Sequence, residues 1–271
     1  MRDKTAKVAV LIPTYAPGAY IENCFRSISQ QSLVKDSFCV YVALNGEEHP
    51  YRAFVEELLL NFDFHYKFFY LNLPGVSNAR NFLIENSSEP YICFVDDDDI
   101  LSSNFLESLL SVSSESVVGI TDVQVFKYND NDSEKNYIGN SYNKLSSVEP
   151  SKFKTRKYFS SAWAKLINRK MICNTRFDIN LSKGEDALFM AQLSHRVHQV
   201  RKAEPEACYY VYLRPGSATR SKISKTPEIK RIFYVLKQYS RLLGDQRYEK
   251  KFLATRILAT LSHLKKLFSL N

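Results

Sequence analysis

Short apolar segments alternate with amphipathic segments along the first 112 residues of the chain. The apolar segments are rich in β-branched and aromatic residues, and they predict strands at residues 7–15, 37–46, 65–73 and 90–99. The segments between them predict helices at residues 19–31, 50–62, 77–87 and 102–112, the last opened by a serine cap. Such short connections indicate βαβ units, and therefore a parallel sheet with helices on both faces.

The second half of the chain has a less regular pattern. The polar stretch at residues 128–147 predicts a mobile loop or an insertion. We expect residues 160–172 to be helical at their end, residues 184–198 to form a helix that begins near Gly184, and residues 207–214 to form a strand. From Thr226 onward the pattern predicts two amphipathic helices. Their apolar faces consist of Ile229, Ile232, Phe233, Leu236, Leu242 and Leu243, and of Phe252, Leu253, Ile257, Leu258, Leu261, Leu264 and Phe268.

The composition is that of a globular protein. With 271 residues, of which 45% are hydrophobic, the chain suits one large domain, with or without a small appendage. No apolar run approaches the roughly 20 residues that span a bilayer, and the first residues show no signal-peptide cleavage site. The five scattered cysteines have no metal-binding spacing, so we expect reduced, buried thiols in a cytosolic protein.

Charge is distributed unevenly. Residues 1–150 hold 11 Lys+Arg and 21 Asp+Glu, whereas residues 151–271 hold 26 and 8, which gives net charges of −10 and +18. A basic half of this size indicates contact with an anion such as nucleic acid, a membrane face or a phosphorylated substrate. A solvated basic surface is at least as good an interpretation of charge alone, and the acidic first half argues against nucleic acid.

Polar residues follow three of the predicted strands, at the edge where parallel sheets bind ligands. Pro13, Thr14 and Tyr15 end the first strand, Asn45 and Gly46 the second, and the run Asp96–Asp99 the fourth. Asp96, Asp98 and Asp99 are spaced to hold Mg2+ or Mn2+ together with substrate phosphates. The alternative is an acidic turn that caps the following helix.

Two further segments carry candidate chemistry. Glu185 and Asp186 lie at a helix start, where they either cap the helix or supply a general base. The segment 212–222 is a glycine-containing loop with Arg214, Ser217, Thr219, Arg220 and Lys222, and it suits a diphosphate as well as it suits an ordinary basic loop. His195 and His198 lack a third ligand nearby and are interpreted as surface residues.

The order "VAVLIPTY … VYVALNG … GVSNARNFLIENSSEPYICFVDDDDIL … AWAKLINRKMI … GEDALF … YYVYLRPGSAT" resembles the family 2 inverting glycosyltransferases of the glycosyltransferase-A fold. It most resembles bacterial enzymes that build capsular polysaccharide and O-antigen, over about residues 6–220. The resemblance implies a Rossmann-like, mostly parallel central sheet flanked by helices. It also implies a catalytic domain at 1–220, with a nucleotide-sugar-binding half at 1–125 and an acceptor-binding half at 126–220. A basic helical extension at 221–271 follows.

The resemblance also implies roles for individual residues. Asp186 is the implied catalytic base, with Glu185 beside it, and Asp98 is the implied metal ligand of a DxD motif, supported by Asp99. Asn45 stands where the family commonly has aspartate, and its amide oxygen can accept from a uracil N–H. Asp97 is the aspartate whose loss we expect to matter least. The nucleotide-sugar contacts implied are Pro13, Thr14, Tyr15, Asn45, Ser77, Arg80, Asp96, Asp97, Lys165, Arg214 and Ser217.

The implied reaction moves a hexose or N-acetylhexosamine from a nucleotide sugar, with UDP-sugar expected, to a hydroxyl of a glycan or a lipid-diphosphate-linked acceptor. It uses Mn2+ or Mg2+ and one inverting displacement. We expect a cytoplasmic protein whose C-terminal helices rest on the inner membrane face, or pack on the catalytic domain or on a second subunit of a homodimer. Two alternatives stay open. One is a non-catalytic relative that binds nucleotide sugar or polysaccharide, and the other is a nucleotidyltransferase, although that class is expected to have a basic, glycine-rich loop where this chain has "IPTYAPGAY".

Overall fold

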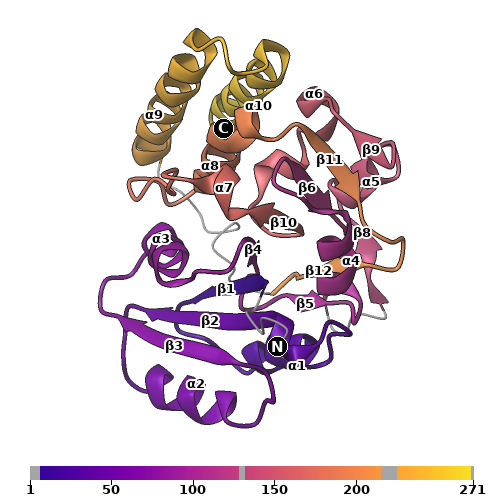
Figure 1. Cartoon of the computed structure of the whole chain (residues 1–271). Coiled ribbons are helices and arrows are strands. Elements are labelled where there is room, and N and C mark those ends of the chain that lie inside the picture. Colours follow the sequence, from indigo (N-terminus) through magenta and orange to yellow (C-terminus); the bar gives the residue numbers. More distant parts are fainter. Residues whose placement is uncertain (1–6, 128–131, 215–224, 270–271) are drawn as a thin grey trace.

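A computed structural model describes residues 7–127, 132–214 and 225–269 of the protein (Figure 1). Residues 128–131 of the expected polar loop lie outside these ranges, as does most of the segment 212–222 with Ser217, Thr219, Arg220 and Lys222.

The first half of the chain forms the predicted βαβ units. Strands β1 (Val8–Thr14), β2 (Phe38–Asn45), β3 (Tyr66–Leu71) and β4 (Tyr91–Phe94) are parallel and lie in the order β3-β2-β1-β4. Every residue of β1 and β2 is buried, because helices cover both faces of the sheet; this explains their unbroken apolar sequences. The connecting helices are η1 (Lys35–Ser37), α1 (Tyr20–Ser29), α2 (Tyr51–Leu59) and α3 (Val76–Asn86).

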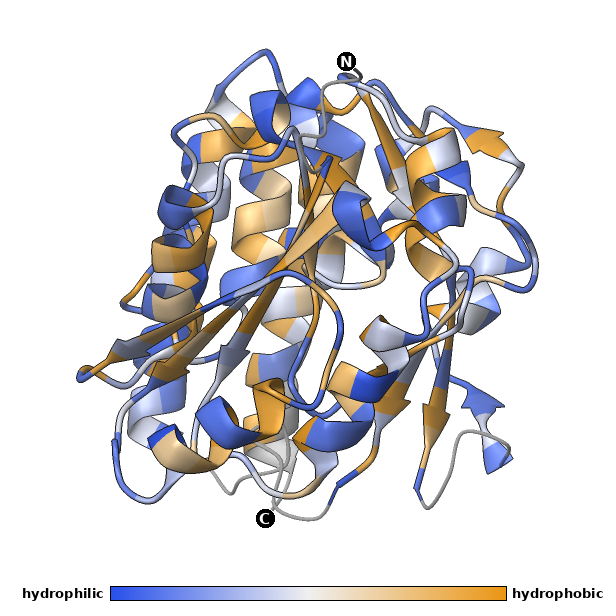
Figure 2. Ribbon diagram, turned by 60° about the horizontal axis from the view of Figure 1, so that its bottom comes forward, coloured by the Kyte–Doolittle hydropathy of each residue, from blue (hydrophilic) through white to orange (hydrophobic). Residues whose placement is uncertain are grey.

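The sheet then continues with segments from the second half. Strand β10 (Lys165–Asn168) lies antiparallel between β4 and β6 (Val117–Ile120), followed by β11 (Gln199–Lys202) and β9 (Val148–Glu149). A second sheet holds β5 (Ile100–Leu101), β12 (Cys208–Tyr212), β7 (Asp122–Phe126) and β8 (Glu134–Lys135). The predicted α/β class is confirmed, with mixed strand directions from β10 onward. Apolar strands run through the middle of the molecule and polar helix faces lie outside (Figure 2).

Several local predictions were wrong. The polar stretch contains β8 and the short helix α5 (Gly139–Tyr142), whose Tyr142 is buried. Residues 160–172 are helical at their end as predicted, in the short helix α7 (Arg169–Ile172), but strand β10 before it and strands β6 and β7 were not predicted. Helix α4 (Phe105–Val112) has Asn104 at its N-cap without a side-chain cap, so the serine cap is absent. These segments are too short to show a period, and their partners lie far away in sequence.

The cysteine prediction is nearly right. Four of the five thiols are buried and all five are free, but Cys173 is exposed.

The C-terminal helices α9 (Lys225–Gly244) and α10 (Lys250–Ser269) pack on each other and on α8 (Glu185–Leu193) and α6 (Lys152–Thr155) (Figure 1). The Phe252 ring of α10 lies 5.2 Å from the Phe159 ring of the 3-10 turn η3 (Tyr158–Ser160), centroid to centroid. A further 3-10 turn, η4 (Ser194–Arg196), follows α8. The apolar faces are thus used in part for packing on the preceding part of the chain. Three residues assigned to these faces, Phe233, Leu258 and Leu261, are 60%, 65% and 40% exposed instead. None of the described helices is both long enough and apolar enough to cross a membrane.

Truncation of the buried Phe252 should show whether α10 contributes to the stability of the catalytic domain. We expect Phe252→Ala to lower the free energy of unfolding by about 3 kcal/mol through lost burial and a residual cavity. Leu258→Ala, on the exposed side of the same helix, should change it by less than about 0.5 kcal/mol. Denaturant unfolding followed by circular dichroism measures both; equal effects would contradict the packing described above.

Candidate active site

Side chains at three strand ends are bonded to one another. The Thr14 hydroxyl at the end of β1 donates to Asp97, and the Asn45 amide at the end of β2 donates to the Thr14 carbonyl over 2.7 Å. The Asn45 amide oxygen accepts from Gly75 N–H, at the N-cap of α3, over 2.8 Å. Asn45 is buried and braces the backbone around the site. Its expected contact with a nucleotide base stays a prediction, and the oxygen proposed for it already accepts one hydrogen bond.

The four aspartates after β4 have different surroundings. The carboxylates of Asp96 and Asp98 are 32% and 16% exposed, whereas Asp97 and Asp99 are buried. Asp99 Oδ1 accepts from Tyr212 N–H of β12 over 2.9 Å, so this carboxylate anchors the second sheet. The assignment of Asp99 as a metal ligand stays a prediction. Asp97 was expected to be the aspartate whose loss matters least. It accepts the hydrogen bond from Thr14 and so joins the run to β1, which makes it less dispensable than expected.

Two guanidinium groups, those of Arg80 and Arg214, face the four carboxylates of the aspartate run. Burial, reinforced by the neighbouring carboxylates, raises the pKa of Asp97 to about 7 and the pKa of Asp99 well above its usual value. Burial also raises the pKa of Asp96 to about 6, against the lowering effect of Arg80. Carboxylate oxygens short of cations are the donor set that Mg2+ or Mn2+ prefers. Asp98 and Asp96, the two partly exposed members, fit such an ion, although the described residues contain no group of three candidate ligands.

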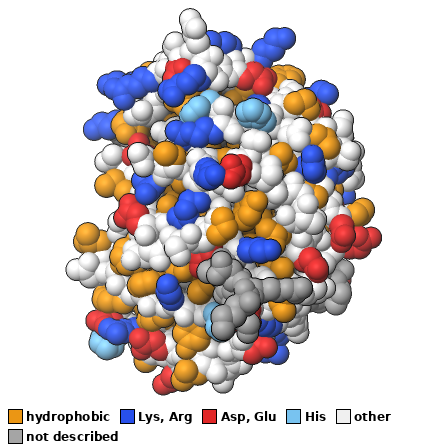
Figure 3. Space-filling view, viewed as in Figure 1, with side chains coloured by type: hydrophobic (Ala, Val, Ile, Leu, Met, Phe, Trp, Pro, Cys, Tyr) orange, Lys and Arg blue, Asp and Glu red, His pale blue; other side chains and the backbone are white. Residues whose placement is uncertain are grey.

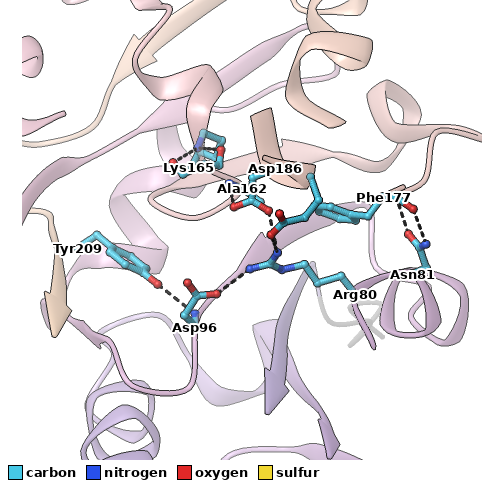
Figure 4. A network of polar contacts seen from close by, with 10 residues as sticks. Arg80, Asn81, Asp96, Ala162, Lys165, Phe177, Asp186 and Tyr209 are labelled. Atoms are coloured by element: carbon cyan, nitrogen blue, oxygen red, sulfur yellow. Dashed lines mark hydrogen bonds and ion pairs between the residues drawn. The ribbon is translucent and has the colours of Figure 1, made fainter. Parts of the chain in front are cut away.

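Arg80 of α3 links the aspartate run to the acids at the start of α8 (Figure 4). Its buried guanidinium donates through Nη2 to Asp96 over 2.9 Å and through Nη1 to Asp186 over 2.7 Å, with Glu185 3.4 Å from Nη1. Burial, reinforced by Asp186, raises the pKa of Glu185 to about 7. Two sequence-predicted sites, the DxD run and the Glu-Asp pair, therefore share one cation.

Besides the bond from Arg80, two further contacts position Asp186 and the residues just before it. Its Oδ2 accepts from Ala162 N–H over 3.1 Å. Arg231 of α9 donates to the Lys183 carbonyl over 3.0 Å and so holds the backbone just before α8. The next residue, Gly184, has a φ of +82°, a conformation that favours glycine. The sequence gives no signal for Ala162 or Arg231, because the first acts through its backbone and the second lies in a helix outside the matched motifs.

Lys165 lies beneath this arrangement. The residue is 1% exposed, and its Nζ donates to the carbonyls of Ser161 and Trp163 over 2.8 and 2.6 Å (Figure 4). Burial lowers the pKa of Lys165 to about 7. Its Nζ thereby holds the backbone around Ala162, and its assignment as a nucleotide-sugar contact stays a prediction.

The remaining candidates divide between surface and interior. Arg214 donates through Nε to Asp98 over 2.7 Å and lies 4.8 Å from the centroid of the Tyr20 ring, a residue that the sequence did not single out. Tyr15 is 55% exposed at the same edge, and Ser77 has a buried hydroxyl without a hydrogen-bond partner. Pro13 is buried within β1, and its assignment as a nucleotide-sugar contact stays a prediction.

Comparison with known proteins agrees with this geometry. The sequence profile of Glycosyl transferase family 2 matches residues 9–177. The chain belongs to this family. Glycosyltransferase GlyA of Streptococcus pneumoniae serotype 4 is 26% identical over 229 residues, which cover 79% of this chain and 32% of GlyA. Teichoic acid poly(glycerol phosphate) polymerase of Staphylococcus epidermidis is 29% identical over 98 residues, covering 36% of this chain and 13% of the polymerase. The matched part is thus at most a third of each relative.

Solved structures show the fold of this family 2 glycosyltransferase. TarS 1-349 of S. aureus in complex with UDP-GlcNAc superimposes with a TM-score of 0.74 at 17% identity, covering 94% of this chain and 71% of that one. Mannosyltransferase PcManGT from Pyrobaculum calidifontis, in complex with GDP-Man and Mn2+, gives 0.64 at 14% identity, with 96% and 70% covered. The predicted glycosyltransferase-A fold is confirmed. The nucleotidyltransferase and non-catalytic alternatives find no support here.

The buried Lys165 should make stability depend on pH. Its pKa is about 7 in the folded chain, below the ordinary lysine value of 10.5. Between these two values only the unfolded state holds the proton, so stability rises with pH. Lys165→Met should remove that rise, which amounts to up to about 1 kcal/mol of unfolding free energy per pH unit. Denaturant unfolding between about pH 7.5 and 9.5 measures the slope. Lys154→Met, at an exposed position, should keep the wild-type slope, and equal slopes in all three proteins would contradict the prediction.

Proposed function

We propose that this family 2 enzyme transfers a hexose or N-acetylhexosamine from a UDP-sugar to a hydroxyl of a surface glycan or of a lipid-diphosphate-linked acceptor, with inversion at the anomeric carbon. The observation that carries the proposal is the Arg80 bridge, because it sets the Asp186 carboxylate beside the aspartate run. A base and a diphosphate site must be neighbours for a single displacement. The names of the relatives, one a glycosyltransferase and one a teichoic acid polymerase, support an acceptor in cell-surface glycan synthesis.

The donor is proposed from the site and from structural neighbours. TarS 1-349 has been solved with UDP-GlcNAc and with UDP, and PcManGT with GDP-Man. In this chain the unpartnered Ser77 hydroxyl in the first turn of α3 and the Arg214 guanidinium at Asp98 offer donors to phosphate oxygens. We assign the diphosphate to this edge, with exposed Tyr15 beside the nucleoside.

A divalent ion, Mn2+ or Mg2+, would be held by Asp98 with Asp96 near it. Such an ion supplies Lewis-acid stabilisation of the diphosphate as a leaving group. The buried Arg80 guanidinium donates to Asp96 and holds it in place, and the Thr14 hydroxyl does the same for Asp97.

Asp186 is the proposed base. Its carboxylate takes the proton of the acceptor hydroxyl while the hydroxyl oxygen attacks the anomeric carbon from the face opposite the nucleotide. The bond from that carbon to the diphosphate oxygen breaks, and its electron pair leaves with the nucleotide. Ala162 N–H and Arg80 fix both carboxylate oxygens, so the base is oriented before the acceptor arrives.

Replacement of the base should separate binding from transfer. Asp186→Asn should reduce transfer about 1,000-fold or more, because the amide cannot accept the proton, while the affinity for the nucleotide sugar stays within about threefold. Calorimetric titration of UDP-sugar and a radiolabelled transfer assay give the two readouts. Full transfer activity in this variant would exclude Asp186 as the base.

The metal assignment is tested by nucleotide binding, without need of an acceptor. Removal of divalent ions with EDTA should weaken UDP binding at least about tenfold, and Mn2+ should restore it. Asp98→Ala should abolish the restoration. The control is Asp63→Ala, which removes an exposed carboxylate outside the aspartate run. Its UDP binding should respond to Mn2+ as that of the wild type does. UDP affinity that is the same in EDTA and in Mn2+ would contradict a metal at Asp98.

The predicted membrane contact of the C-terminal helices and the predicted homodimer stay predictions.

A further inference from the structure

Helix α10 buries an arginine without an anionic partner. Arg256 is 9% exposed, and its Nε has no hydrogen-bond partner. Among the residues that the structure describes, none forms an ion pair with it; the aromatic ring of Phe252 lies 5.7 Å from its guanidinium carbon. Burial of an unpaired charge costs several kcal/mol. A leucine or methionine would fill this place without that cost, so the guanidinium indicates an anion that binds here.

Helix α6, which directly precedes Arg156, packs on α10. Burial lowers the pKa of Arg256, and the positive charge of Arg156 lowers it further, against the raising effect of Tyr239 and Tyr137. Lys157 donates from Nζ to the Tyr137 carbonyl over 3.1 Å. Arg156 uses Nη1 to bond the Phe153 carbonyl over 2.7 Å.

The carboxylates that border this cluster have other partners. Glu149 pairs with Lys154 over 3.2 Å, and Glu249 accepts from Lys152 N–H over 3.2 Å. Neither carboxylate therefore supplies the negative charge that the arginines lack.

The cluster of Arg256, Arg156 and Lys157 lies on the side of the proposed base. The Tyr137 hydroxyl lies 3.1 Å from Ser160 Oγ, two residues before Ala162, whose N–H binds Asp186. Phe159 of the same segment packs on Phe252, one turn before Arg256. Lysine and arginine side chains are frequent over the half of the molecule that holds α9 and α10 (Figure 3). Asp98 and Arg214, by contrast, lie at the edge of the site to which the diphosphate of the donor is assigned.

We propose that Arg256, Arg156 and Lys157 form an acceptor subsite for a phosphate group, such as the phosphodiester or diphosphate of a phosphate-bearing glycan or lipid carrier. The assignment rests on the proposed function, since it takes the Asp186 side as the acceptor side. A planar guanidinium matches two phosphate oxygens at once, and a second arginine with a lysine neutralises a doubly charged group. The subsite also assigns a function to part of the net charge of +18 in residues 151–271, which the donor site does not explain.

Inorganic phosphate is the probe for this subsite. Titration calorimetry at constant ionic strength, with the donor site filled by UDP, should show phosphate binding to the wild type. Arg256→Met keeps the buried stem and removes the charge, and it should weaken phosphate binding at least about tenfold. Lys251→Met removes an equal charge from an exposed position on the same helix, and it should stay within about twofold of the wild type. If Arg256→Met fails to fold, Arg156→Gln, at a partly exposed position, should still lose about threefold or more.

The readouts separate this proposal from the proposed function. UDP affinity and hydrolysis of the nucleotide sugar should be unchanged in Arg256→Met. If the wild type itself neither binds nor hydrolyses nucleotide sugars, the proposed function fails, while phosphate titration of the wild type and Arg256→Met without UDP still tests the subsite. Unchanged phosphate binding in Arg256→Met overturns the subsite.

A membrane source of phosphate is tested by sedimentation with phosphatidylglycerol and phosphatidylcholine vesicles. We expect Arg256→Met to bind phosphatidylglycerol vesicles as the wild type does, because a guanidinium that is 9% exposed does not present itself to a flat surface. Loss of vesicle binding with intact binding of inorganic phosphate would assign the cluster to lipid headgroups instead, and would overturn the acceptor assignment.

Discussion

The repulsion among four consecutive aspartates after β4 is the constraint on which the arrangement of the site depends. Burial removes the water that would screen these charges, so each carboxylate needs its own partner. The structure supplies four partners from four different elements: the Arg80 guanidinium for Asp96, the Thr14 hydroxyl for Asp97, the Arg214 guanidinium for Asp98 and the Tyr212 backbone N–H for Asp99. One local run thereby ties β1, α3, β12 and the residues after β12 to the end of β4.

Arg80 also makes the two sides of the site electrostatically dependent on each other. A guanidinium shared by Asp96 and Asp186 cannot be drawn toward one carboxylate without weakening its bond to the other. Phe177 stacks near it, 5.3 Å from the guanidinium carbon, and Asn81 holds the Phe177 backbone with two hydrogen bonds. The position of Arg80 is therefore fixed by packing as well as by charge.

The second half of the chain supports the base through cations that bind backbone carbonyls. Lys165 holds the segment that carries Ala162, and Arg231 holds the segment that precedes Glu185. Arg231 belongs to α9, so the C-terminal helices contribute to the site's geometry in addition to their burial of Phe252. Arg256 differs from both, because its Nε meets no hydrogen-bond acceptor among the described residues.

The sequence by itself determined the first four strands and their helices, because buried parallel strands need unbroken apolar runs, and it placed Thr14, Asn45 and the aspartate run at one edge. Arg80 and Asp186 were added to the site by the family resemblance. It did not determine the strands β6 and β10, which are four residues long and are stabilised by neighbours distant in sequence. Only the tertiary structure decided which carboxylates face solvent, that Lys165 and Asn45 point into the interior, and that Arg80 bonds to Asp186, 106 residues away in sequence, as well as to Asp96. The physical reason is that burial and pairing of a charge depend on groups brought from elsewhere in the chain, which leave no local pattern.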